Sequence, residues 1–257
     1  MGCSSSQPQY KPGVPISQIQ SQIQPLDLIV FRGNGVTSDV ISLAEKLYLG
    51  SGDWSHVGIV ITSDIVPIAN AQPNRLYLWE STTPSFTRPV NSIETGQPTY
   101  GVQIRDLEEV INNYDLELDS RTGWCQLINN PYLQINNESS ETFSERRKAI
   151  SNLLNEFYQR YGQQGYDYNC LNLCSPFCYT GADKFRQICG QSDRMFCSEL
   201  VVSIYQKLGI LKSDLNPETI APVGLVGYAG PDNSLTCPVK IPPVIITRNW
   251  ESTSVTL

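Results

Sequence analysis

The chain has 257 residues, with 25 acidic and 18 basic side chains, 8 cysteines and a single histidine. A formal net charge of −7 argues against a general nucleic-acid binder, because such proteins neutralise phosphates with clustered Lys and Arg. With one histidine, the chain cannot form a metal site that needs several histidine ligands, and any mechanism that needs an imidazole must use His56. Eighteen glycines and 17 prolines favour a mixed, β-containing fold with many loops over a helical bundle.

The chain opens with a pattern typical of double lipidation. Gly2 follows the initiator Met and Ser6 follows four positions later, which fits N-myristoylation, and Cys3 is a candidate for palmitoylation. Two acyl chains anchor a protein stably, whereas one holds it marginally. Residues 1–24 are therefore expected to form an acylated, disordered tether, with a short helix near Ile16, Ile19 and Ile23. An ordinary polar start is the alternative.

The sequence also shows neither a secretory signal nor an apolar run of bilayer-spanning length. Together with the lipidation pattern, this predicts a lipid-anchored protein on the cytoplasmic face of a membrane. Most of its thiols are then expected to be reduced.

Residues 25–257 are expected to form one domain with a Cys-rich insertion at 169–193. Apolar and β-branched runs predict the strands, and helical spacing between capping and Gly signals predicts the helices. The strands are expected at 27–31, 55–61, 76–80, 101–104, 124–128 and within 241–246. The helices are expected at 37–50, at 106–114, from Thr142, which has capping-box spacing to Glu145, to Gly162, and from Cys197 to Gly209.

Three side chains could form a nucleophilic site. At the start of a helix, Cys197 would face unpaired backbone N–H groups, which favour a thiolate and could also bind an oxyanion. His56 shares one side of its strand with Gly58, whose missing side chain would leave room for a substrate or for the nucleophile's helix. If the neighbouring strand pairs with it, Glu80 could accept a hydrogen bond from the imidazole and fix its tautomer. A core histidine and a packing cysteine are the alternative.

Four segments, in this order, resemble the circularly permuted NlpC-like papain fold, a group that includes bacterial YiiX-like proteins and poxvirus and giant-virus relatives. The opening strand also resembles that of the group, with Leu26 where relatives usually have Gly. The segments are Ser55-His56-Val57-Gly58-Ile59-Val60, Leu78-Trp79-Glu80-Ser81, Gly165-Tyr166-Asp167-Tyr168 and Phe196-Cys197-Ser198-Glu199-Leu200-Val201.

The resemblance implies an α+β, papain-like fold in which an antiparallel sheet packs against the helix that carries the nucleophile. It implies a thiol hydrolase without a cofactor, with Cys197 as nucleophile, His56 as base and Glu80 as the group that orients the base. Tyr166 is similar to an aromatic position near the substrate in relatives.

We therefore expect a membrane-tethered, cysteine-dependent hydrolase or acyltransferase that cleaves an amide, ester or thioester through a thioacyl-enzyme. Its substrate would be a peptide, as in cell-wall relatives, or a lipid, as in lecithin:retinol acyltransferase-like enzymes. One alternative is a non-catalytic, membrane-anchored interaction module that keeps the fold. Another is a zinc-stabilised scaffold built on Cys170, Cys174, Cys178 and Cys189, although their even spacing departs from the usual paired ligands.

Overall fold

The computed structural model describes residues 13–32, 54–82, 89–114, 121–162, 165–166, 194–226 and 238–249. A seven-stranded sheet with the order β1-β9-β6-β2-β3-β4-β5 forms the centre of the fold, and all neighbouring strands are antiparallel except β1 and β9. The strands are β1 (Val14–Pro15), β2 (Leu28–Arg32), β3 (His56–Ile61), β4 (Tyr77–Thr82), β5 (Gly101–Asp106), β6 (Arg121–Cys125) and β9 (Val244–Thr247). The expected α+β class with an antiparallel sheet is confirmed.

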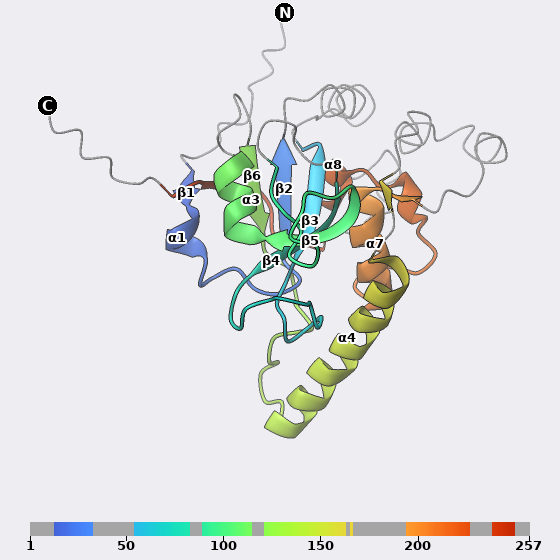
Figure 1. The fold of residues 1–257 in the computed structure, drawn as a ribbon. Helices are drawn as coiled ribbons and strands as arrows, with labels where there is room; N and C mark the ends of the chain where they lie inside the picture. The colour runs from blue at the N-terminus through green and yellow to red at the C-terminus, as the bar shows by residue number, and fades with distance from the viewer. Residues whose placement is uncertain are drawn as a thin grey trace, which may run out of the picture.

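Helices cover both faces of this sheet (Figure 1). Alternation along β2 sends Leu28 and Val30 into one apolar cluster and Ile29 and Phe31 into another. The first cluster includes α4 and α7, and the second includes α1 and α3. The helices are α1 (Ile16–Ile19), α3 (Leu107–Tyr114), α4 (Ser140–Tyr161), α7 (Cys197–Lys207), α8 (Pro222–Leu225) and the short 3₁₀ helix η2 (Pro217–Thr219).

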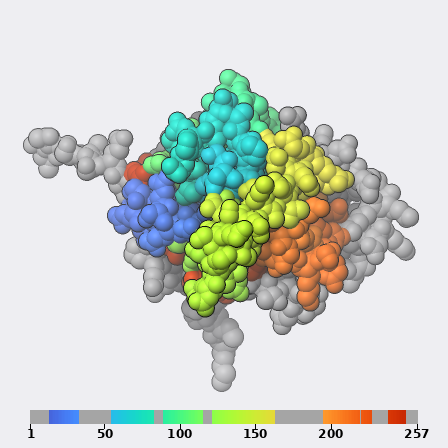
Figure 2. Space-filling model, turned by 90° about the horizontal axis from the view of Figure 1, so that it is seen from below, coloured from blue at the N-terminus to red at the C-terminus, as the bar shows by residue number. Residues whose placement is uncertain are grey.

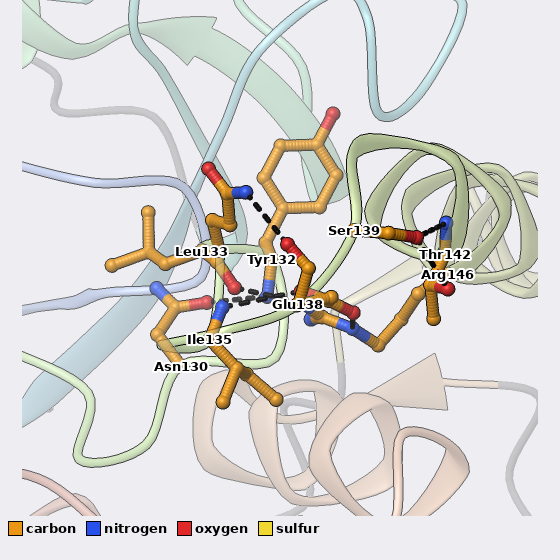
Figure 3. Close-up of polar contacts among 9 residues, drawn as sticks. Asn130, Tyr132, Leu133, Ile135, Glu138, Ser139, Thr142 and Arg146 are labelled. Atoms are coloured by element: carbon orange, nitrogen blue, oxygen red, sulfur yellow. Dashed lines mark hydrogen bonds and ion pairs between the residues drawn. The ribbon is translucent and has the colours of Figure 1, made fainter.

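The N-cap of the long helix α4 lies three residues before the one that the sequence predicts. Ser139, not Thr142, is the N-cap: its side-chain oxygen accepts the backbone N–H of Thr142 at 3.1 Å. The Arg146 guanidinium, one helical turn on, pairs with Glu138 and donates to the Leu133 carbonyl, which ties the preceding loop to the helix (Figure 3). Seen from below, α4 crosses between residues 54–82 and residues 194–226 (Figure 2).

Residues 13–24 are folded, whereas the sequence places them in the tether. The strand β1 pairs with β9, and Ile16, Ile19 and Ile23 are buried against the sheet. Of the expected tether, therefore, only residues 1–12 lie outside the described residues.

Leu26 and Asp27 fix the entry of the chain into β2. Leu26 has a positive φ of 72° and is fully buried, so its backbone adopts a conformation that favours glycine. Asp27 is also fully buried and accepts hydrogen bonds from the indole of Trp124 and from the backbone N–H groups of Gln24 and Leu127. Burial raises the pKa of Asp27, although these donors act against the shift.

Most expected elements exist, with changed ends. β4 and β5 each run two residues further than expected, and β6 starts three residues earlier. The helix that begins at Cys197 ends at Lys207, and Gly209 follows with a φ of 69°, as a helix-ending glycine should. The helix expected at 37–50 lies outside the described residues.

Candidate active site

The start of α7 meets the sheet at the end where β3 begins and β4 finishes. His56 is the first residue of β3, and Ser81 stands one residue before the end of β4. The buried Ser81 hydroxyl donates a hydrogen bond of 2.5 Å to the carbonyl of Met195, two residues before Cys197. Cys197, the first residue of α7, lies close enough to His56 for its charge to act on the imidazole. Residues 141 positions apart in the chain are thus brought together.

Glu80 completes this set from the neighbouring strand. β3 and β4 pair in antiparallel register, with Ile59 opposite Trp79, which brings Glu80 to the level of Gly58. The Nε2 atom of His56 lies 2.5 Å from Oε2 of Glu80, whose side chain is fully buried, whereas 15% of the imidazole side chain is exposed. The carboxylate therefore holds the orientation of the imidazole from the buried side.

Gly58 has a different role from the expected one. A Cβ atom built on Gly58 would lie 2.7 Å from Cδ1 of Leu78 and 3.1 Å from Cβ of Glu80. The missing side chain therefore makes room for side chains of β4, and not for a substrate or for the helix of the nucleophile. The glycine still serves the site, because it lets Glu80 approach β3 closely.

Arg105 is part of this cluster, and the sequence reasoning missed it. It lies on β5, opposite Leu78 of β4, and its Nε donates to Oε1 of Glu80 at 2.7 Å. Its Nη2 also pairs with the same oxygen. The two carboxylate oxygens are thus divided, with Oε1 facing Arg105 and Oε2 facing His56. The sequence signal for Arg105 is a basic residue at a strand position where alternation places the side chain on the same face as Glu80.

The charges within this cluster support one another. Burial alone would lower the pKa of His56, but the neighbouring Cys197 thiolate and the Glu80 carboxylate outweigh it and raise the pKa to about 10. Burial alone would raise the pKa of Glu80, but Arg105 and His56 outweigh it and lower the pKa. His56 is therefore an imidazolium and Glu80 a carboxylate at neutral pH.

The other expected site residues are described in part or not at all. The backbone of Tyr166 pairs with Met195 in the short parallel ladder of β7 (Gly165–Tyr166) and β8 (Arg194–Met195), close in the chain to Cys197, while its side chain lies outside the described part. The lipidation candidates Gly2 and Cys3 lie outside it as well, as do Cys170, Cys174, Cys178 and Cys189 of the zinc alternative.

In the part of the chain that the structure describes, no three side chains from His, Cys, Asp and Glu are grouped so that they could hold a metal ion. Among the helices of the same residues, none is both long and apolar enough to cross a bilayer.

Comparisons with known proteins give little beyond this geometry. No protein-family model matches the chain, and no curated protein sequence matches it. Among solved structures, the chain is similar to the crystal structure of the metalloprotein yiiX from Escherichia coli O157:H7. The two share 17% sequence identity with a TM-score of 0.41, over 90% of this chain and 99% of the other.

Proposed function

We propose that the chain is a cysteine-dependent acyl hydrolase or acyltransferase with a permuted, NlpC-like papain arrangement. The observation that carries the proposal is the Glu80 carboxylate 2.5 Å from Nε2 of the single imidazole, with Cys197 at the start of α7 near enough for its charge to act on the same ring. A nucleophile, a base and a group that orients the base are the three parts that thiol catalysis needs.

The chemistry follows from the charges of these groups. The Cys197 thiolate attacks an acyl carbonyl carbon, a C–S bond forms, and the carbonyl oxygen becomes an oxyanion. Cys197 is the first residue of α7, and backbone N–H groups at the start of a helix can stabilise such an oxyanion. Because Nε2 of His56 faces Glu80, its Nδ1 is left to give a proton to the leaving group as the C–N, C–O or C–S bond breaks.

A thioacyl-enzyme results, and a second nucleophile releases the acyl group. Water, deprotonated by the neutral imidazole, gives hydrolysis, and an alcohol, amine or thiol gives acyl transfer. In both cases the C–S bond breaks, the imidazolium is restored and the thiolate leaves.

The substrate and the place of action belong to the same proposal. Myristoylation of Gly2 and palmitoylation of Cys3 would hold the protein at the cytoplasmic face of a membrane. Substrates at that surface, lipids or acylated peptides, would then be present at high local concentration. A soluble peptide amide is the other substrate class that this chemistry accepts.

Trapping an acyl group on Cys197 tests the proposal. Trypsin cleaves after Arg194 and Lys207, so the peptide 195–207 has Cys197 as its only cysteine, and the peptide 122–146 likewise isolates the buried Cys125. After exposure of the full chain to cell membranes and lysate, we expect an acyl mass on peptide 195–207 that hydroxylamine removes, and none on peptide 122–146.

The same adduct should be absent from the His56→Gln variant, and its mass identifies the substrate class. Peptide 195–207 without any acyl mass, or with equal acylation in the His56→Gln variant, contradicts the proposal. That result would favour the non-catalytic interaction module.

A further inference from the structure

Arg105 stands behind Glu80 as the second cation of a four-residue charge cluster. Glu80 receives His56 from β3 on one carboxylate oxygen and Arg105 from β5 on the other. The side chain of Glu80 is fully buried, and those of His56 and Arg105 are only 15% and 11% exposed. The charge of Cys197, from α7, also acts on His56. The cluster therefore holds two acidic side chains, Glu80 and Cys197, and two basic ones, His56 and Arg105.

The charge balance of this cluster decides which of its groups can be ionised together. A buried charge is tolerated when an opposite charge compensates it, whereas an uncompensated one strongly destabilises the fold. With Arg105, a carboxylate and a thiolate are balanced by a guanidinium and an imidazolium. Without Arg105, two anions share one imidazolium, and the cluster gains by taking up a proton.

We propose that Arg105 is a positioning residue of this site, which neutralises Glu80 so that the positive charge of His56 remains available to the Cys197 thiolate. This inference rests on the proposed function, because it concerns the same thiol. It differs from a merely structural role, in which Arg105 only ties β5 to β4.

The chain offers a matched control for that structural role. Arg75 pairs through its Nε with Asp106, the residue next to Arg105 on β5, and its side chain is 43% exposed. The Arg75→Gln change removes an arginine–carboxylate pair at the same strand without removing a partner of Glu80. Arg105→Lys is the second comparison, because Arg105 contacts a single carboxylate oxygen, which an ammonium group can also serve.

The test is the pH profile of Cys197 alkylation by iodoacetamide, measured on peptide 195–207 between pH 5 and 10. We expect Arg105→Gln to move the midpoint of the rate about 1 pH unit upward, which is roughly a tenfold slower reaction on the acid side. Arg105→Lys should restore most of the shift, and Arg75→Gln should match the wild type. An Arg105→Gln profile that superposes on the wild type, or an Arg105→Lys profile equal to that of Arg105→Gln, overturns the inference.

A double variant keeps the test sharp if Arg105→Gln disturbs the local fold. In a Glu80→Gln background there is no carboxylate to neutralise, so adding Arg105→Gln should shift the midpoint less than it does in the wild type. An equal shift in both backgrounds overturns the inference. Failure of the proposed function looks different: the wild-type Cys197 would then react as a free thiol, and His56→Gln would change nothing.

Discussion

Replacing His56 by Gln should slow the alkylation of Cys197 at pH 6 by about 10²-fold. An ordinary cysteine, with a pKa near 8.5, is less than about 1% thiolate at pH 6. A neighbouring imidazolium favours the thiolate form of a cysteine, and the chain has no second histidine to replace His56. The measurement is the rate at which iodoacetamide modifies peptide 195–207.

Peptide 122–146 supplies the control within each sample. Cys125 is the last residue of β6 and is fully buried, so it should stay unmodified in the wild type and in the variant as long as both are folded. Equal rates at Cys197 in the two proteins, with Cys125 protected in both, would show that the imidazole does not activate the thiol.

The free energy of unfolding should fall as the pH rises from about 8.5 to about 10, and the ion pair of His56 with Cys197 should account for most of the fall. The folded state keeps the imidazolium, next to a thiolate, up to a pKa of about 10, whereas in an unfolded chain an ordinary histidine loses its proton near pH 6.5 and an ordinary cysteine near pH 8.5. Between those two values both states hold one proton on the pair and stability is level, and above about pH 8.5 only the folded state holds it. The loss up to about pH 10 is on the order of 2 kcal/mol.

Urea unfolding at about pH 7, 8.5 and 10 measures this dependence. The wild type should lose stability between the last two values, and His56→Gln should lose much less, because it has no imidazolium for the folded state to keep. Parallel curves would mean that His56 loses its proton in the folded state at an ordinary pH.

The strands that carry the site could be predicted because their apolar and β-branched residues form short runs typical of buried strands. Ser55 to Ile61 is a β-branched run that must bury itself, and the pairing of its strand with that of Glu80 follows from their short separation in the chain. The helix that starts at Cys197 follows from its apolar spacing and from Gly209. The sequence thus predicted the two strands and the helix that carry the three expected side chains.

The parts that could not be predicted depend on strand register and on tertiary burial. From sequence alone, Arg105 is expected to be a solvent-facing residue of an alternating strand. Only the register of β4 and β5 places it beside Glu80. The contribution of Gly58 likewise depends on which β4 side chains lie across from it. Ile16, Ile19 and Ile23 stand in a Ser- and Gln-rich stretch that is typical of a tether, and the sheet they cover is completed only by β9, more than 200 residues later.

A nuclear magnetic resonance titration of the imidazole tests the central claim most directly, because the chain has a single histidine and the signal needs no assignment. The account predicts that the ring stays protonated through neutral pH and titrates with a pKa of about 10. In the Cys197→Ala variant the midpoint should be lower, because the thiolate is the partner that raises the pKa of His56 most. A wild-type midpoint near 6.5, unchanged by Cys197→Ala, would contradict an ion pair between Cys197 and His56 and the catalytic site built on it.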